Sequence, residues 1–211
     1  MKNVLCYGDS NTWGCIPVTG SEPPRRLPPA ERWPGILRRE LGSDYWIVED
    51  GLNGRTTVWD DELEPHRKGL ESLLPTLLTH QPLDLVIVML GTNDLKRRFR
   101  VSAPQIAEGA GMLVDVVRTS ACGPDGAAPE ALLICPPPLG RLTQFADEFE
   151  GAPEESRRLA ECFAAVAESR ACVFVDAGMH VSSSDTDGIH LDRDAHAALG
   201  GAIAAAVARI A

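Results

Sequence analysis

Hydrophobic positions along the chain follow two patterns, short continuous apolar runs and longer segments with helical spacing. The clearest run, LDLVIVML at 83–90, is typical of a strand that is buried on both faces of a parallel sheet. In Gly69–His80, by contrast, leucines recur every three or four residues, which predicts a helix with one buried face. Pro75 lies within this segment and predicts a kink or a split. This alternation of strand and helix is the pattern of an α/β fold.

The remaining apolar runs and helical segments extend the alternation over the whole chain. Further strands are predicted at Lys2–Tyr7, Tyr45–Glu49, Ala131–Cys135 and Cys172–Asp176. Further helices are predicted at Glu31–Leu41, Pro104–Ser120, Pro153–Ser169 and Arg193–Ile210. Two long segments, 16–29 and 51–68, are predicted to be loops that form functional walls or partner contacts. Because helices connect the parallel strands by right-handed crossovers, we expect one three-layer α/β/α domain over residues 1–211.

The composition and charge of the chain argue against several classes of partner. An apolar share of 44% and a charged share of 24% are ordinary for a globular protein, and 211 residues can bury a sizeable core. The net charge of −10 disfavours nucleic acids and anionic membranes, because both require a basic surface. We expect the basic cluster Lys96–Arg98 with Arg100 to be a solvated face. The chain shows neither an apolar stretch long enough for a membrane span nor a signal peptide, so we expect a cytoplasmic location.

The sequence indicates neither a metal site nor a cofactor site. The six cysteines contain no C-x-x-C pair, so a zinc site is not expected. Acidic residues cluster after Ser184, but an EF-hand loop starting at Asp185 would place Ile189 and His196 where oxygen ligands are required. The chain also lacks the glycine-rich strings of phosphate-binding and dinucleotide-binding loops.

Polar residues with catalytic chemistry follow four of the predicted strands. In strand order these residues are Ser10, the pair Asn53-Gly54, Asn93, and finally His190 with Asp187 three residues before it. In an open α/β sheet, the loops after parallel strands emerge at one edge, and ligands bind there. We therefore expect these side chains to converge although they lie far apart in the sequence.

Cleavage of an ester by a serine requires a nucleophile, a base and donors for the developing oxyanion. Ser10 is the candidate nucleophile, His190 the candidate base, and Asp187 the carboxylate that orients the imidazole. The candidate oxyanion donors are the main-chain N–H groups of Ser10 and Gly54 and the side-chain amide of Asn93.

Each of these residues taken singly has a simpler structural explanation. Ser10 can be a turn serine that caps the following helix, and Asn53-Gly54 is a common turn sequence. The coincidence of four such loops, each after the appropriate strand, favours a catalytic site.

At these positions the chain resembles the SGNH hydrolases, also called GDSL-type esterases. The matching strings are Gly8-Asp9-Ser10, Asn53-Gly54-Arg55-Thr56-Thr57, Gly91-Thr92-Asn93-Asp94 and Asp187-Gly-Ile-His190. The longer strings CYGDSNTWG, EDGLNGRTT and DGIHLD are similar to the bacterial arylesterase and acyltransferase branch. The resemblance implies a flavodoxin-like sandwich with a five-stranded parallel sheet in the order 2-1-3-4-5. It also implies hydrolysis of short-chain aryl or alkyl esters through an acyl-enzyme, without a cofactor.

The resemblance leaves the substrate and the assembly open. Some members of that branch transfer the acyl group to an alcohol or to peroxide, and some form oligomers, so acyl transfer and a homo-oligomer are expectations here. Asn11 stands where the usual motif has Leu, so the acyl preference of the family is not carried over. The candidate pocket residues are Asn11, Trp13 and Ile189, with Phe145 and Phe149 as further candidates. Three alternatives remain: deacetylation of a sugar, hydrolysis of a thioester, and a flavodoxin-like binding module whose serine is inert.

Overall fold

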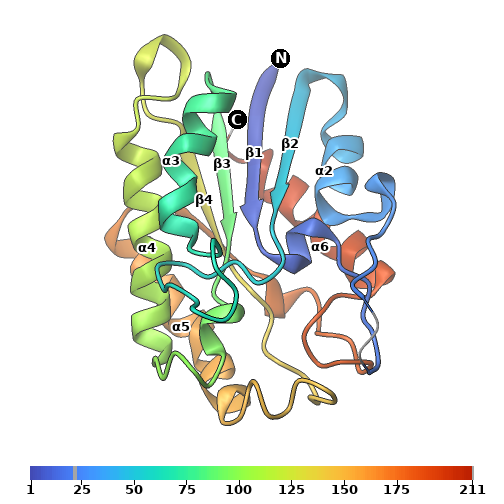
Figure 1. Cartoon of the computed structure of the whole chain (residues 1–211). Helices are drawn as coiled ribbons and strands as arrows, with labels where there is room; N and C mark the ends of the chain where they lie inside the picture. The colour runs from blue at the N-terminus through green and yellow to red at the C-terminus, as the bar shows by residue number, and fades with distance from the viewer. Residues whose placement is uncertain (21–22, 211) are drawn as a thin grey trace.

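The computed structural model describes residues 1–20 and 23–210 of the chain. Within these residues the strands form one parallel sheet of five strands in the order β2-β1-β3-β4-β5, as expected. The bounds of the strands are β1 Lys2–Gly8, β2 Tyr45–Gly51, β3 Leu85–Met89, β4 Glu130–Cys135 and β5 Val173–Asp176. The chain has the predicted α/β architecture, with helices on both faces of the sheet (Figure 1).

The helices divide between the two faces of the sheet (Figure 1). One face is covered by α2 (Trp33–Leu41) and α6 (Arg193–Val207), which pack against each other. The other face is covered by α3 (Gly69–His80), α4 (Ala103–Thr119) and α5 (Ala152–Ser169). No helix among the described residues combines the length and the hydropathy that crossing a membrane would require.

Strand β1 separates two apolar cores. Leu5 and Tyr7 belong to the core under α3, α4 and α5, whereas Val4 and Cys6 belong to the core under α2 and α6. This division follows from the two-residue period of a strand, which directs successive side chains to opposite faces. Because both faces are buried, the central strands are almost continuously apolar, as the run at 83–90 predicted.

Two local features differ from the predictions. A short helix, α1 (Ser10–Trp13), follows β1 directly, and its first turn is capped by the Asp9 carboxylate, which accepts the N–H of Asn11 at 2.9 Å. The sequence predicted a kink or a split at Pro75, and helix α3 continues through this residue without a split. Both Leu73 and Leu77, on either side of the proline, are fully buried, so packing holds the helix together at this point.

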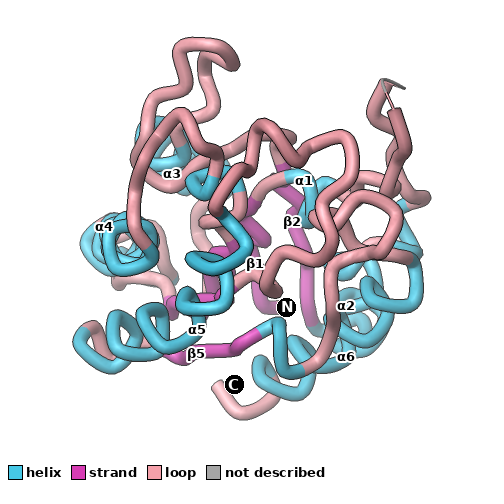
Figure 2. The backbone as a smooth tube through the Cα atoms, turned by 90° about the horizontal axis from the view of Figure 1, so that it is seen from below, coloured by secondary structure: helices cyan, strands magenta, loops and turns pink. Residues whose placement is uncertain are grey.

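The loops that follow the strands gather at the carboxyl edge of the sheet. Figure 2 views the molecule from this side and shows the segments after β1 and β2 lying over the strand ends. The predicted loop at 16–29 lies here, except for positions 21 and 22, which are outside the described residues.

Candidate active site

The transition from β1 to α1 positions the Ser10 hydroxyl at the carboxyl edge of the sheet. Ser10 is the first residue of α1, and its carbonyl accepts the N–H groups of Gly14 and Cys15, both at 2.9 Å. The Asp9 cap fixes the start of the same helix. The Asp9 cap and the contacts of the Ser10 carbonyl therefore fix the backbone of Ser10 just after the central strand β1.

Ser10, His190 and Asp187 form a continuous chain of hydrogen bonds. With the proton on Nδ1, His190 donates to Asp187 Oδ2 at 2.7 Å. His190 Nε2 then accepts from the Ser10 hydroxyl at 3.1 Å. Asp187 Oδ1 accepts the main-chain N–H groups of Ile189 and His190 at 3.0 and 2.9 Å. Ser10, near the start of the chain, is thus in hydrogen-bond contact with His190, which in turn contacts its near neighbour Asp187.

The contacts of Asp187 determine the charge distribution at this point. Burial opposes the ionised carboxylate, but hydrogen bonds from His190 and Ile189 outweigh this effect and lower the pKa of Asp187. Burial likewise disfavours a charged His190 ring, yet the hydrogen bond to Asp187, with a contribution from Cys15, raises the pKa of His190 above its ordinary value. The ionised Asp187 can therefore stabilise the imidazolium that forms when His190 accepts a proton.

Gly54 and Asn93 line the same cavity as Ser10 and His190. Gly54 has a φ of +79°, in the left-handed region, so the backbone at this position favours glycine. Asn93 Nδ2 donates to the Arg55 carbonyl at 3.1 Å and approaches Asp9 Oδ2 at 3.4 Å. Among the described residues, no acceptor is assigned to the N–H groups of Ser10 and Gly54. These N–H groups are therefore free to bind a ligand oxygen.

Buried polar contacts connect the loop after β2 to its neighbours. The Arg55 guanidinium donates to the carbonyls of Gly8 and Asp50 at 2.9 and 2.7 Å. Asp94 accepts both the N–H and the hydroxyl of Thr57. The desolvation of Asp94 raises its pKa to about 6, even though these hydrogen bonds favour the charged form. The 53–57 loop is thus tied to β1 and to the loop after β3.

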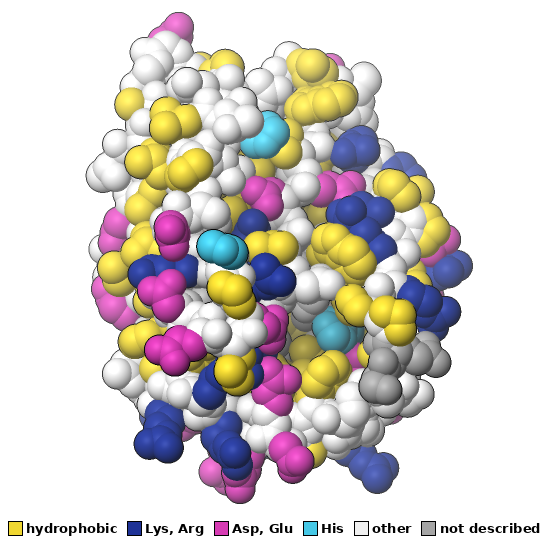
Figure 3. Space-filling model, viewed as in Figure 1, with side chains coloured by type: hydrophobic (Ala, Val, Ile, Leu, Met, Phe, Trp, Pro, Cys, Tyr) yellow, Lys and Arg dark blue, Asp and Glu magenta, His cyan; other side chains and the backbone are white. Residues whose placement is uncertain are grey.

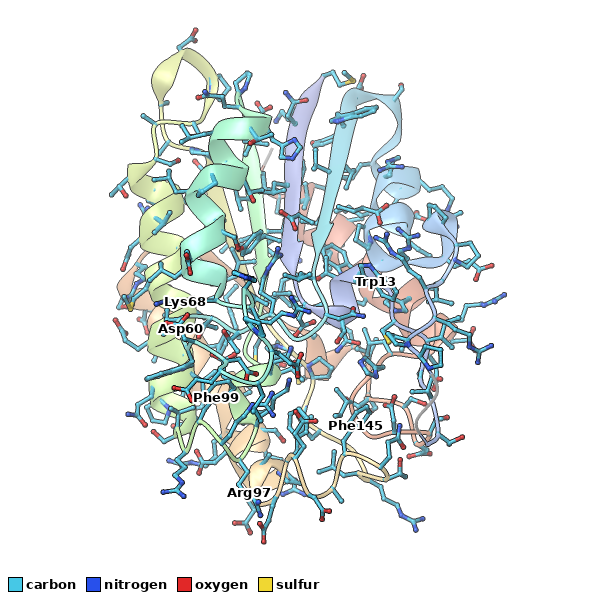
Figure 4. All side chains as sticks on the ribbon, viewed as in Figure 1. Trp13, Asp60, Lys68, Arg97, Phe99 and Phe145 are labelled. Carbon is cyan, nitrogen blue, oxygen red and sulfur yellow. The ribbon has the colours of Figure 1, made fainter. Side chains whose placement is uncertain are left out.

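The pocket beside Ser10 has a volume of about 340 Å³ and is lined by both apolar and charged residues. The apolar lining includes Val18, Phe145, Phe149 and Ile189. The Phe145 ring meets the His190 ring edge-on, with 6.1 Å between the centroids, and Figure 4 shows Phe145 among the loops below the sheet. The charged lining includes Glu64, Lys96 and Glu148. Charged side chains of both signs also gather on the surface at this end of the molecule (Figure 3).

Of the predicted pocket residues, Ile189, Phe145 and Phe149 line the cavity, whereas Asn11 and Trp13 are not among its described lining residues. Helix α1 directs the Asn11 side chain to the main chain on either side of His190. The Trp13 ring lies against the Arg26 guanidinium at 4.9 Å, well away from Phe145 (Figure 4).

The prediction of a solvated basic cluster at 96–98 is wrong for Lys96. Its side chain is 5% exposed, and Nζ donates to Glu64 at 2.8 Å and lies 3.3 Å from Glu148. Arg98 also pairs with these two carboxylates, whereas the Arg97 side chain is 64% exposed. Carboxylates from two other loops neutralise the buried ammonium, and a one-dimensional charge pattern does not show them.

Two features of the site could not be predicted from the sequence. The Val18 N–H donates to Asp187 Oδ2 at 3.2 Å, and a main-chain group leaves no residue signature. The Cys15 thiol lines the cavity, although nothing in the spacing of the cysteines distinguished it. The described part of the chain contains no cluster of His, Cys, Asp and Glu suited to a metal ion.

Comparison with known proteins identifies relatives over the length of the chain. The model of the GDSL-like lipase/acylhydrolase family matches residues 6–198. An aryl esterase from M. smegmatis is 41% identical and superposes with a TM-score of 0.96, with 100% of both chains covered. Est24, a carbohydrate acetylesterase from Sinorhizobium meliloti, is 42% identical with the same TM-score and full coverage of both chains. No significant match was found among curated proteins.

On the basis of these similarities, the protein is a carboxylic ester hydrolase. The chain belongs to the GDSL-like lipase/acylhydrolase family, the SGNH hydrolases. A lipase/acylhydrolase from Enterococcus faecalis, at 16% identity and a TM-score of 0.71, shares the fold.

Proposed function

We propose that the protein hydrolyses short-chain acyl esters through a covalent acyl-enzyme on Ser10. The observation that carries the proposal is the line of hydrogen bonds from the Ser10 hydroxyl through His190 to Asp187, with distances of 3.1 and 2.7 Å. A nucleophile, a base and an orienting carboxylate in mutual contact are what acyl transfer to a serine requires.

In the first half of the reaction, Ser10 Oγ attacks the ester carbonyl carbon while His190 Nε2 takes the hydroxyl proton. Asp187 stabilises the resulting imidazolium and keeps the ring oriented. The tetrahedral intermediate then collapses, the bond to the leaving oxygen breaks, and His190 donates its proton to that oxygen. The first product is the free alcohol, and the acyl group remains on Ser10.

In the second half, a water molecule attacks the acyl carbon while His190 takes one of its protons. The bond between the acyl carbon and Ser10 Oγ then breaks, and the proton returns to Ser10. In both halves the oxyanion is bound by the N–H groups of Ser10 and Gly54 and by an Asn93 amide N–H, which exchanges its long contact with Asp9 for the oxyanion. The support for these donors is that all three residues line the cavity beside Ser10.

The pocket supports small acyl esters as substrates. A cavity of about 340 Å³ is small, and its apolar lining of Val18, Phe145, Phe149 and Ile189 suits aryl or alkyl groups. A second candidate substrate is an acetylated sugar, because Est24 is a carbohydrate acetylesterase and is 42% identical to this chain. Turnover of p-nitrophenyl esters of increasing length, acetylated sugars and an acyl thioester distinguishes these substrates from one another.

Acyl transfer to an alcohol or to peroxide requires the same acyl-enzyme, with the acceptor in place of water. Measuring ester exchange in the presence of alcohols tests this reaction. The homo-oligomer and the cytoplasmic location expected from the sequence stay predictions, and analytical ultracentrifugation tests the first.

Replacement of the nucleophile tests the proposal. We expect Ser10→Ala to lower kcat for p-nitrophenyl acetate by roughly 10⁴-fold or more, because the triad acts as a unit. Ser156→Ala is the matched control, since Ser156 is also a buried serine but lies in α5. Turnover by folded Ser10→Ala equal to that of Ser156→Ala would contradict the proposed mechanism.

A further inference from the structure

Asn11 directly follows Ser10, and its side chain is almost completely buried, with 1% of the residue exposed. Its carboxamide makes two hydrogen bonds to a segment 178 to 180 residues away in the sequence. Nδ2 donates to the carbonyl of Ile189 at 3.3 Å, and Oδ1 accepts the N–H of Leu191 at 3.0 Å. The two main-chain groups belong to the residues immediately before and after His190.

The carboxamide of Asn11 therefore brackets His190 from both sides. Other hydrogen bonds hold the His190 loop from within, among them the Ile189 and His190 N–H groups on Asp187 and the Ser184 N–H on the His190 carbonyl. The Asn11 contacts differ because they connect this loop to the helix that carries Ser10. The position of the His190 imidazole relative to the Ser10 hydroxyl therefore depends on the hydrogen bonds of the Asn11 side chain.

The residue type at position 11 matters for this coupling. An amide has a donor and an acceptor on one planar group, so it can serve a carbonyl and an N–H on the same segment. A leucine, which branches at Cγ as asparagine does but is bulkier, would leave the Ile189 carbonyl and the Leu191 N–H without these partners in a buried place. The loop would then have to shift to satisfy them.

We propose that Asn11 is a positioning residue that sets the distance and angle between His190 Nε2 and Ser10 Oγ. This inference rests on the proposed function, in which that contact transfers the proton. The side chain of Asn11 touches neither the cavity nor the reacting atoms, so its effect passes through the main chain on either side of His190.

The test compares Asn11→Leu with the wild-type enzyme and with Tyr7→Phe. Tyr7 is fully buried, and its hydroxyl donates to the Gly69 carbonyl at 2.7 Å, so Tyr7→Phe also removes a buried hydrogen bond to main chain, away from the His190 loop. We expect Asn11→Leu to lower kcat for p-nitrophenyl acetate by about 10- to 100-fold with KM nearly unchanged, because small displacements of catalytic groups are costly. The rate of Ser10 labelling by a fluorophosphonate should fall in parallel.

For Tyr7→Phe we expect a lower midpoint of thermal unfolding but the kcat of the wild-type enzyme. If Asn11→Leu does not fold, Asn11→Ala provides the same comparison without added bulk. A folded Asn11 variant that keeps kcat within about twofold of wild type would overturn the positioning role. An equal loss of kcat in Tyr7→Phe would overturn it as well, since the effect would then follow stability alone.

The Ser10→Ala variant separates this inference from the proposed function. If Ser10→Ala is inactive while Asn11→Leu keeps full turnover, the proposed function stands and the positioning role fails. If Ser10→Ala retains wild-type turnover, the proposed function itself fails.

Discussion

At the scale of single residues, the chemistry of the site depends on the hydrogen bonds that the two oxygens of the Asp187 carboxylate accept. One oxygen accepts two main-chain N–H groups, and the other accepts the ring of His190 and the N–H of Val18. These contacts keep the carboxylate ionised and raise the pKa of the imidazole. The base is thus stronger than an isolated histidine, and its charged form has a partner.

The pH profile reports the state of this base. Only neutral His190 can accept the proton of Ser10, so kcat/KM should fall as the pH drops through the pKa of His190. Because Asp187 raises that pKa, Asp187→Asn should move the acid limb to lower pH, while its plateau falls by roughly 10⁴-fold. The measurement is kcat/KM for p-nitrophenyl acetate in both proteins, from below the ordinary histidine pKa of about 6.5 up to about pH 10. An acid limb at the same pH in both proteins would contradict the role of Asp187.

At the scale of elements, the loop between β2 and α3 brings the Gly54 N–H to the cavity. Arg55 holds this loop to the end of β1, and Asp94 holds Thr57 from the loop after β3. Gly54 itself occupies the left-handed region, with the Glu64 carboxylate where a Cβ would lie. The position of the N–H is thus fixed by contacts from three directions.

A methyl group at Gly54 should disturb this arrangement. We expect Gly54→Ala to lower the free energy of unfolding by about 1–2 kcal/mol, the cost of left-handed backbone for a non-glycine residue. It should also lower kcat, because a non-glycine residue relaxes away from the left-handed conformation and so displaces the N–H. Gly126→Ala is the control, with a φ of +75° and no atom within 4 Å of the added Cβ. Equal effects of both substitutions on kcat would exclude Gly54 as an oxyanion donor.

The sequence predicted elements better than it predicted contacts between them. The convergence of Ser10 with His190 follows from catalytic residue types in the loops after strands, whereas the strand order was implied by the resemblance to the SGNH hydrolases. The partners of Asn11 and Lys96 could not be predicted in this way, because they lie on segments far apart in the sequence. The contact of Val18 with Asp187 could not be predicted either, because it uses a main-chain N–H that every residue except proline has.

At the scale of the whole molecule, the two helical layers bury ionisable groups as well as apolar ones. His196 in α6 is fully buried against α2, where its Nδ1 accepts the N–H of Trp33 at 3.3 Å. Burial, with smaller contributions from His190 and Arg32, lowers the pKa of His196 to about 4. The packing of α2 on α6 therefore requires a neutral histidine.

This requirement makes stability depend on pH. Below the ordinary histidine pKa, about 6.5, the unfolded chain binds a proton at His196, whereas the folded protein does not do so until about pH 4. The free energy of unfolding should therefore fall by about 3 kcal/mol over this window through His196.

His196→Gln isolates this contribution, because glutamine accepts a hydrogen bond but does not titrate. Between pH 8 and pH 5, the free energy of unfolding measured in urea should decrease less for the variant than for the wild-type protein. Asp9 and Asp94 titrate in the same range in both proteins, so their contributions cancel in the difference. If the difference in the free energy of unfolding between the two proteins is the same at both pH values, His196 does not make stability depend on pH.

The most direct test of the central claim is covalent labelling of the native protein with a fluorophosphonate, followed by peptide mass spectrometry. An activated serine attacks the phosphorus, so we predict one label per chain, located on Ser10, and loss of esterase activity in proportion to labelling. His190→Ala should react far more slowly, because it lacks the base. A label on another serine with Ser10 unmodified, or no label on a fully active enzyme, would contradict Ser10 as the nucleophile.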